Sequence, residues 1–229
     1  MATIDKTQQD AEKLAAALAA VKFVKDGDVV GLGTGSTTTF AIKELGKRVK
    51  DGLKIKAAAS SIRTEELAKS LGIEILDLGH LSEIDISIDG ADEFAESLDL
   101  IKGGGGALFR EKIIASLSKN AIIITDASKK VKKLGVFTVP VEVIPLAYQY
   151  VSDQINELGG KGILRSVANK TFITDNGNLI IDADFGLIDD PAKLSANLNQ
   201  INGLLAHGLF INITSKVIMS EGTDIIIFE

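Results

Sequence analysis

The sequence predicts an α/β fold, in which a doubly wound, mostly parallel sheet is joined to a second, smaller ferredoxin-like α+β domain. Short apolar runs alternate with helical stretches through the first half of the chain, an arrangement typical of a parallel sheet with both faces covered. Beyond Gly135, where all three prolines lie, the expected order becomes β-α-β-β-α-β. We therefore assign residues 1–135 and 211–229 to the main α/β domain and residues 136–210 to the small domain.

In the first part of the chain, helices and strands are expected to alternate. Leu14, Leu18 and Val21 recur at helical spacing in an alanine-rich stretch, which predicts a helix over residues 10–24. Further helices are expected to end near Val49 and to span 65–70 and 107–117. The strands are predicted from short apolar runs at residues 29–32, 53–59, 73–78, 84–88 and 121–125. Such sheets bind ligands beyond the carboxyl ends of their strands, where the glycine-rich and acidic segments of this chain fall.

The second part of the chain predicts the small domain. Its expected elements, in order, are a strand over 136–143, a helix over 146–158, a hairpin of 165–174 with 179–183 around Asp175–Asn178, a helix from Pro191 to about Gln200, and a strand over 204–210. The apolar runs 216–219 and 224–228 are expected to return to the main sheet.

The composition narrows the possible functions. A chain of 229 residues with 45% hydrophobic side chains can bury one core, or one core and a smaller satellite. Its formal net charge of -6 argues against general affinity for nucleic acid or for an anionic membrane surface. The absence of cysteine excludes disulfides, thiolate metal ligands and cysteine nucleophiles. The two histidines, His80 and His207, are a thin basis for a metal site or a Ser-His-Asp triad.

The N-terminus also bears on localisation. It has no apolar signal core, and no apolar run in the sequence is long enough to span a bilayer. We therefore expect a soluble, cytoplasmic protein.

A glycine-rich segment, Gly31-Leu-Gly-Thr-Gly-Ser-Thr37, lies between an expected strand and an expected helix. Backbone amides at such a helix start bind phosphate well, and Thr34, Ser36 and Thr37 would add hydroxyl donors. The segment is not a dinucleotide fingerprint, because Ser36 occupies the third glycine position, and it lacks the Gly-Lys-Ser/Thr ending of a P-loop. An ordinary connection with a Ser/Thr N-cap is the alternative. Together with the two segments below, it favours phosphate binding.

Three acids, Asp89, Asp92 and Glu93, follow the apolar strand at 84–88. Turn formation and helix capping are common reasons for aspartate in such a position. Paired carboxylates in a confined cleft can instead shift each other's pKa and divide acid from base work, which is the interpretation that we favour.

Lys102 precedes four consecutive glycines, Gly103–Gly106. Glycines cost conformational entropy unless the backbone must lie close to something, so this loop is expected to wrap an anionic ligand. A flexible solvent loop is the weaker alternative, because a helix signal follows. On that helix the spacing of Arg110-Glu111-Lys112 predicts an exposed charged patch, with Glu111 on the surface. Lys129 and its neighbours would complete an anion site, although such charge runs are more often solvated.

Five segments together resemble the ribose-5-phosphate isomerase type A family. They are Gly33-Thr-Gly-Ser-Thr37, Ser60-Ser-Ile-Arg-Thr64, Asp89-Gly-Ala-Asp-Glu93, Lys102-Gly-Gly-Gly105 ahead of Arg110-Glu-Lys112, and Asp126-Ala-Ser-Lys129. Their order and spacing match the family over nearly the whole chain, including the small domain. The combination is highly specific, although no single segment is.

The resemblance implies a reaction and the residues that carry it. The reaction interconverts D-ribose 5-phosphate and D-ribulose 5-phosphate through an enediolate, in the pentose phosphate pathway, without a metal or an organic cofactor. Glu111, Asp89, Asp92 and Lys102 are implied as catalytic residues, which overturns the surface interpretation of Glu111. The implied substrate-binding residues are Thr34, Gly35, Ser36, Thr37, Asp89, Gly90, Ala91, Asp92, Lys102, Gly103, Gly104, Gly105 and Lys129.

Three further positions stand out against the family pattern. Lys13 is the nearest match to an N-terminal lysine that contributes to the phosphate site in some members. Gly106 stands where alanine is expected, and Phe109 where a small polar residue is expected.

Two other classes of function remain open from the sequence. Sugar-phosphate-sensing domains of some transcription regulators share the general fold and bind without turnover, but the residues before Gly31 leave room for only one helix. Coenzyme A transferases are related in architecture and use a glutamate as nucleophile, so an acyl-enzyme at Glu111 would favour them. We expect a sugar phosphate as the partner and a homo-oligomer, in the first instance a homodimer, although the sequence does not itself specify the oligomeric state.

Overall fold

The computed structural model describes residues 6–229, and the chain forms two compact units. The first unit contains the residues up to Ala91, Ile113–Lys129 and Ile213–Glu229, and the second contains Asp92–Lys112 and Lys130–Asn212. The second unit is therefore larger than the predicted small domain, since it also takes in the glycine-rich loop and the start of the helix that follows.

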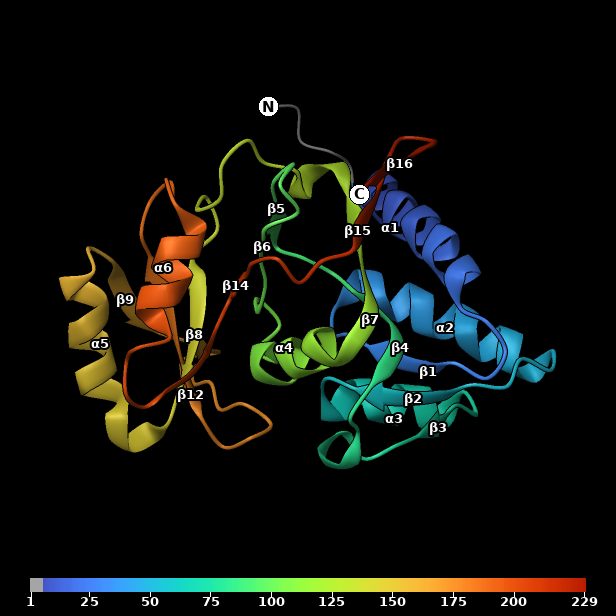
Figure 1. The fold of residues 1–229 in the computed structure, drawn as a ribbon, viewed down its shortest axis with the longest axis horizontal. Helices are drawn as coiled ribbons and strands as arrows, with labels where there is room; N and C mark the ends of the chain where they lie inside the picture. Colours follow the sequence, from blue (N-terminus) through green and yellow to red (C-terminus); the bar gives the residue numbers. More distant parts are fainter. Residues whose placement is uncertain (1–5) are drawn as a thin grey trace. The chain divides into compact units, whose positions relative to one another are not determined.

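The first unit is built on a seven-stranded sheet (Figure 1). Its strands, in the order in which they neighbour one another, are β16 (Asp224–Phe228), β15 (Lys216–Glu221), β7 (Ser118–Asp126), β4 (Ile84–Asp89), β1 (Val29–Leu32), β2 (Lys56–Ala59) and β3 (Glu74–Ile75). All neighbours are parallel except β15 and β16, which form an antiparallel hairpin. The mostly parallel sheet, with the two C-terminal runs returned to it, is confirmed.

Helices cover both faces of this sheet, as a doubly wound fold requires. On one face lie α1 (Lys6–Ala20) with the short helix η1 (Val21–Phe23), α2 (Ser36–Lys50) and α3 (Ile62–Ser70). The other face packs on the second half of α4 (Leu108–Leu117) and on the segment around η2 (Leu78–His80), through a cluster centred on Ala58, Ile84 and Ile114.

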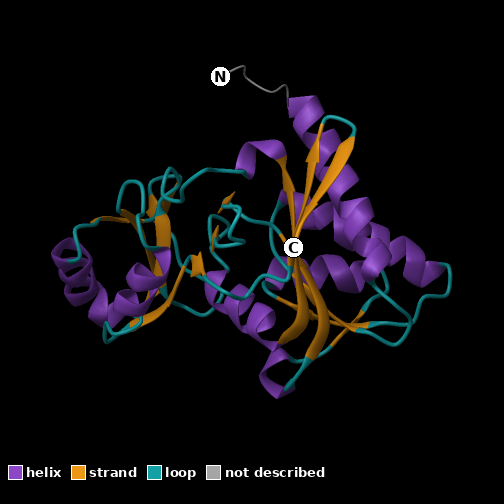
Figure 2. Cartoon of the chain, turned by 45° about the horizontal axis from the view of Figure 1, so that its top comes forward, coloured by secondary structure: helices purple, strands orange, loops and turns teal. Residues whose placement is uncertain are grey.

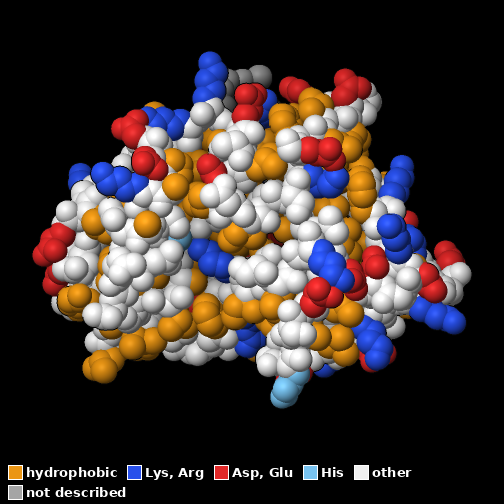
Figure 3. Space-filling model, viewed as in Figure 1, with side chains coloured by type: hydrophobic (Ala, Val, Ile, Leu, Met, Phe, Trp, Pro, Cys, Tyr) orange, Lys and Arg blue, Asp and Glu red, His pale blue; other side chains and the backbone are white. Residues whose placement is uncertain are grey.

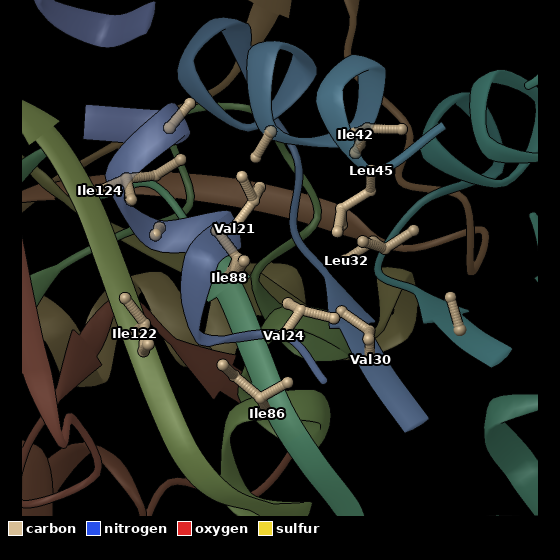
Figure 4. Packing of buried hydrophobic residues seen from close by; sticks show 14 of the residues in the cluster. Val21, Val24, Val30, Leu32, Ile42, Leu45, Ile86, Ile88, Ile122 and Ile124 are labelled. Atoms are coloured by element: carbon tan, nitrogen blue, oxygen red, sulfur yellow. The ribbon is translucent and has the colours of Figure 1, made fainter. Parts of the chain in front are cut away.

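The main core lies between the sheet and the first of these helix layers (Figure 4). Alternate residues of the strands point into it, including Val30 and Leu32 of β1 and Ile86 and Ile88 of β4. Each such side chain contributes roughly 1.5–3 kcal/mol on burial. The ends of β1 and β4 lie side by side, since Leu32 pairs with Ile88, and both side chains pack in this core.

The second unit contains a four-stranded antiparallel sheet (Figure 2). Its elements in chain order are β8 (Val139–Val143), η4 (Pro145–Ala147), α5 (Tyr148–Glu157), β9 (Lys161–Leu164), β12 (Leu179–Asp184), α6 (Pro191–Leu198) and β13 (Leu204–His207). The strand order β13-β8-β12-β9 is that of a ferredoxin-like βαββαβ unit. Residues of α5 and α6 join the core on one face, and Leu108 and Phe109 of α4 pack on Ile180 from the other.

The predicted hairpin of the small domain is wrong in its pairing. Residues 165–174 form their own short hairpin, in which β10 (Ser166–Val167) pairs with β11 (Lys170–Thr171). Ala168 and Asn169 at its tip have positive φ angles of 50° and 60°, as a two-residue type I′ turn requires. Strand β12 pairs instead with β9, a strand that the sequence did not predict.

The predicted strand over 204–210 divides between two sheets. Its first part is β13, and its second part, β14 (Leu209–Phe210), joins β6 (Leu100–Ile101) and β5 (Glu93–Phe94) in a three-stranded sheet. Gly208 lies at the division, where its carbonyl accepts a hydrogen bond from the Lys102 N–H at 2.9 Å. These pairings explain why residues 92–112 belong to the second unit.

Two observations concern the charged surface and the possibility of a membrane-spanning helix. On the face shown in Figure 3, basic and acidic side chains are interspersed rather than gathered into one extended patch. Within residues 6–229 there is no helix with both the length and the apolar character needed to cross a membrane.

Candidate active site

The predicted phosphate loop connects β1 to α2. It runs from Gly33 to Ser36, the first residue of α2, and Gly35 occupies the N-cap position with a φ of 130°. No described side chain caps the first amides of α2, so these N–H groups and the positive end of the helix dipole are available to an anion. Ser36 is exposed and Thr37 half-buried, as hydroxyl donors to a ligand need to be.

The Thr34 hydroxyl group, which was predicted as a phosphate donor, lies among other hydroxyl groups of the first unit. The Thr34 Oγ1 lies 2.7 Å from Ser60 Oγ and 2.9 Å from Ser61 Oγ, and Thr64 Oγ1 donates to the Gly33 carbonyl at 2.9 Å. The hydroxyl groups of Ser60, Ser61 and Thr64 follow β2 and contact the loop at Gly33 and Thr34. Ser60, Ser61 and Thr64 were not predicted as site residues, although the run of hydroxyl side chains after an apolar strand is a signal that could have found them.

Asp89 lies at the end of β4, and its carboxylate is tied to the phosphate loop. Its Oδ1 accepts hydrogen bonds from the N–H groups of Thr34 at 3.1 Å and Gly90 at 2.7 Å, and lies 3.4 Å from the Thr38 hydroxyl. Gly33 lies against this side chain, and a Cβ at position 33 would overlap the carboxylate. Asp89 and the glycine-rich loop are therefore held together by direct contacts within the first unit.

Asp92 and the loop Gly103–Gly106 are likewise held together by direct contacts, in the second unit. Asp92 Oδ2 accepts the Gly104 N–H at 2.7 Å. Arg165 Nη1 donates to the carbonyls of Gly103 at 2.9 Å and Gly104 at 3.2 Å, while its guanidinium is paired with Asp182. A planar fork that is fixed by a carboxylate is well suited to hold a loop in one conformation. Sequence reasoning missed Arg165, because nothing near it in the chain marks it as part of the site.

Lys102 and Glu111 form a buried ion pair. The Lys102 Nζ lies 3.3 Å from the Glu111 Oε2, and their side chains are 4% and 3% exposed. Glu111 is in the first turn of α4, where the helix dipole stabilises a carboxylate. The surface position that spacing alone predicted for Glu111 is therefore wrong. Desolvating such a pair is costly, and removing one partner of a buried pair typically costs about 3–5 kcal/mol.

The third acid of the cluster has a structural role. Both oxygens of Glu93 accept backbone N–H groups, from Phe137 at 2.6 Å and Gly135 at 2.8 Å. Its carboxylate therefore anchors the segment before β8 and is occupied within the second unit.

Lys129 and Lys13, the two remaining predicted cations, both belong to the first unit. Lys129 is half-buried on η3 (Ala127–Lys129) at the end of β7, and it has no ion pair with any residue in the described part of the chain. Lys13 lies on α1 with a side chain that is 12% exposed, 3.9 Å from Asp10. An unpaired lysine at a strand's carboxyl end is suited to an anionic group.

A further set of polar groups surrounds Lys112, the residue after Glu111. Its Nζ donates to the Leu209 carbonyl at 2.9 Å and lies 3.5 Å from His207 Nδ1. Burial lowers the pKa of Lys112 to about 7. Burial, and then the charge of Lys112, lower the pKa of His207 to about 3. His207 is therefore a neutral, buried histidine at ordinary pH.

The comparisons with known proteins point in one direction. A family profile described as Ribose 5-phosphate isomerase A (phosphoriboisomerase A) matches residues 56–224. The chain is 45% identical to the Ribose-5-phosphate isomerase A of Sphingopyxis alaskensis, over 93% of each protein. It is also 45% identical to Ribose-5-phosphate isomerase A 1 of Oceanobacillus iheyensis, over 96% of this chain and 99% of the relative. The chain belongs to the ribose-5-phosphate isomerase A family.

Solved structures of the family resemble the whole chain. Ribose 5-phosphate isomerase A of Methanocaldococcus jannaschii has a TM-score of 0.91 and 40% identity, over 96% of this chain and 99% of that one. A D-ribose-5-phosphate isomerase in complex with phospho-erythronic acid has a TM-score of 0.93 and 40% identity over the same shares. The fold predicted from the family resemblance is therefore confirmed.

Two positions that were expected to depart from the ribose-5-phosphate isomerase A pattern are explained by packing. Gly106 has a φ of 83° and lies against the Phe172 ring, which a Cβ would overlap. Alanine, which was expected there, would be strained. Phe109 packs beside Phe172 in the cluster of Leu108, Ile180 and Ala206, so a large apolar residue suits its position.

Within the described residues, no group of three or more His, Asp or Glu side chains converges in a way that could hold a metal ion. The polar groups of the candidate site are instead carboxylates, lysines, hydroxyl groups and backbone amides, which can bind an anion and transfer protons.

Proposed function

We propose that this chain interconverts D-ribose 5-phosphate and D-ribulose 5-phosphate by proton transfer through an enediolate. The observation that carries the proposal is the buried Lys102–Glu111 pair at the start of α4, directly after the glycine loop. A carboxylate can take a proton from carbon, and an ammonium beside it can stabilise the negative oxygen that results. The family membership of the chain and the phospho-erythronic acid complex of its relative support the same reaction.

The phosphate group is assigned to the first unit. The amides of Gly35, Ser36 and Thr37 at the start of α2 would bind its oxygens, together with the hydroxyl groups of Ser36 and Thr37. Lys129 would balance its charge or bind a neighbouring hydroxyl group. Thr34 belongs to the site through its backbone, which links the loop to Asp89.

The ring and the hydroxyl groups of the sugar are assigned to the acids. Asp89 would assist ring opening by accepting the anomeric hydroxyl proton, and Asp92 would orient the hydroxyl groups of the open chain. The backbone of Gly90 and Ala91 connects these two acids and would line the bound sugar.

Proton transfer is assigned to Glu111. Its carboxylate would remove the C2 proton of the open-chain aldose, so that the electrons of the C–H bond form the enediolate double bond and negative charge moves to O1. Transfer of the O2 proton to O1 and return of the carbon-bound proton to C1, as the O2 electrons form the new C2=O2 bond, give the ketose. Lys102 and the amides of Gly103 and Gly105 would stabilise the oxyanion throughout, while the Gly104 N–H is held by Asp92. The proposed steps need no metal ion, organic cofactor, nucleic acid or membrane.

The test is proton NMR of ribose 5-phosphate with the protein in deuterated water. Formation of ribulose 5-phosphate with deuterium at the transferred position is the expected result. A protein that binds the sugar phosphate without any conversion or exchange would act as a sensor, and the proposed reaction would be wrong. Transfer of an acyl group from a coenzyme A thioester to Glu111 would place the chain with the transferases instead.

We further propose that the protein acts in the cytoplasm as a homo-oligomer, in the first instance a homodimer. In support, β16 is an edge strand of the large sheet, and its Ile225 and Ile227 are 39% and 46% exposed. Exposed apolar edges favour association. Light scattering after size-exclusion chromatography should give twice the 24.2 kDa chain mass, and a monomer at micromolar concentration would contradict the dimer.

A further inference from the structure

We propose that the aromatic ring of Phe210 is a positioning element for the Lys102 ammonium group, and that Lys112 competes with Lys102 for this ring. Phe210 belongs to none of the motifs that predicted the site. The inference rests on the proposed function, because the effect of the ring is expressed through the Lys102–Glu111 pair.

The ring and the ammonium group come from two segments that are fixed to each other. Phe210 is 1% exposed on β14, where it pairs with Leu100 of β6, and Lys102 follows directly after that strand. The Lys102 N–H donates to the Gly208 carbonyl at 2.9 Å. The Lys102 Nζ lies 5.3 Å from the centroid of the Phe210 ring, within the range of a cation–π interaction.

This contact supplies what a lysine otherwise lacks. A lysine ammonium group is a point charge on a flexible four-carbon stem, without the planar fork that orients an arginine. Glu111 holds the Lys102 Nζ from one direction, at 3.3 Å, and the ring attracts the same charge without competing for its hydrogen-bond donors. Phe210 can therefore hold the charge while its N–H groups turn toward a developing oxyanion.

Lys112 presents a second cation to the same ring. Its Nζ lies 4.8 Å from the Phe210 centroid, and within the described part of the chain it has no carboxylate partner. The groups that face it are the Leu209 carbonyl, the Phe210 ring and His207, while Glu111 is its neighbour on α4.

His207 is neutral beside Lys112. Its Nδ1 accepts the Leu209 N–H at 3.3 Å, so its proton is on Nε2, which faces Asn199 Oδ1 at 3.1 Å and Ser195 Oγ at 3.4 Å. With a neutral histidine, a carbonyl and a ring as its surroundings, Lys112 loses its proton near neutral pH. Below that pH the ring is shared by two cations, and above it Lys102 has the ring to itself.

The test replaces Phe210 with a series of phenylalanines that carry one, two or three fluorine atoms on the ring. Fluorination weakens the negative face of the ring with little change in its size. We expect kcat to fall stepwise along the series, by roughly 2- to 30-fold in total, while the KM for ribose 5-phosphate changes less than twofold. The same series at Phe185 is the matched control, because this ring packs in the core of the second unit and no cation of the described residues lies over it.

The second arm uses Lys112→Met, which removes the competing cation. In the wild-type protein the sensitivity of kcat to fluorination should be greater at pH 8.5 than at pH 6, and in Lys112→Met it should be the same at both. A kcat that does not follow the number of fluorine atoms would overturn the positioning role of Phe210. A sensitivity that is the same at both pH values in the wild-type protein would overturn the competition. A wild-type protein without isomerase activity would instead contradict the proposed function, so the two failures are distinguishable.

Discussion

Gly33 lies so close to Asp89 that a single methyl group at position 33 would overlap the Asp89 carboxylate. The carboxylate also accepts the N–H of Thr34, the residue after Gly33. One close approach thus joins the phosphate loop at the end of β1 to the acid at the end of β4.

Replacement of this glycine should therefore damage the site without removing any functional group. In Gly33→Ala the Asp89 carboxylate must move, and misplacement by about 1 Å costs on the order of 10²-fold in rate. We expect kcat/KM for ribose 5-phosphate to fall by about that factor. Gly79→Ala is the control, since only Asp77 Oδ1, at 3.3 Å, is near a Cβ there. Equal activity of the two variants would show that Asp89 has no role that depends on its position.

Glu111→Gln should strongly slow proton transfer while keeping the shape of the side chain. General-base catalysis contributes on the order of 10²–10⁴-fold, so turnover should fall by at least roughly that range. Deuterium exchange should fall in parallel, since both pass through the same deprotonation, and binding of ribose 5-phosphate should change much less. The exposed Glu66 of α3 provides the matched Glu66→Gln control. If Glu111→Gln isomerises at a near-normal rate, Asp89 or Asp92 becomes the leading base.

Free ribose should be a far poorer substrate than ribose 5-phosphate. The loop at the start of α2 would lose its anion, and two or more charge-assisted hydrogen bonds of about 1.5–3 kcal/mol each correspond to roughly 10²-fold or more. The measurement is kcat/KM for both sugars, with inorganic phosphate as a competitive inhibitor of the phosphorylated one. Comparable efficiencies would contradict the phosphate assignment of Gly35, Ser36 and Thr37.

Exhaustive chelation should leave the isomerase activity unchanged. The proposed proton transfer is carried by Glu111 and Lys102, and no step is assigned to a metal ion. Activity is measured before and after treatment with EDTA and dialysis, and then after addition of divalent ions. Loss of activity that a divalent ion restores would refute the cofactor-free mechanism.

Lys112 should make the stability of the protein depend on pH in the alkaline range. Burial lowers its pKa to about 7 in the folded protein, whereas an unfolded lysine titrates near 10.4. Between these two values the unfolded state binds more protons, so this residue makes the free energy of unfolding rise with pH, by at most ~1.4 kcal/mol per pH unit. Urea denaturation from pH 7 to 10 should show a smaller rise in Lys112→Met than in the wild-type protein. The exposed Lys132 provides the control Lys132→Met, and equal slopes in all three proteins would contradict the lowered pKa.

Local patterns were sufficient for much of the fold. The strand at Val29–Leu32 was predicted at its observed bounds, and the apolar runs of β4 and β7 were recognised within slightly longer strands. These runs are almost continuously apolar, as strands buried on both faces of a sheet are. This pattern can be recognised in the sequence alone. The pairing of the hairpin in the small domain was predicted wrongly, because the turn of the observed β10–β11 hairpin depends on positive φ angles at Ala168 and Asn169. Neither residue is a glycine, which would have marked the turn.

The contacts between the site residues were harder to predict from the sequence than the location of the site. Spacing alone made Glu111 a surface residue, because Arg110-Glu111-Lys112 is a pattern common to solvated helices. In the structure Glu111 is buried and paired with Lys102, which precedes the glycine loop, and only the tertiary structure brings the two together. Arg165 was missed for the same reason, as its contacts with the glycine loop join segments that are distant in the chain.

The hydrogen bond from Lys102 to Gly208 also has a consequence for the order of events during biosynthesis. Strand β14 is made long after β6, so a growing polypeptide that still lacks Gly208 and Phe210 can pair β6 only with β5. Contacts between residues so distant in the chain form late, because a long loop must close before they can contribute. The Lys102 N–H therefore gains its Gly208 acceptor only after most of the chain has been synthesised.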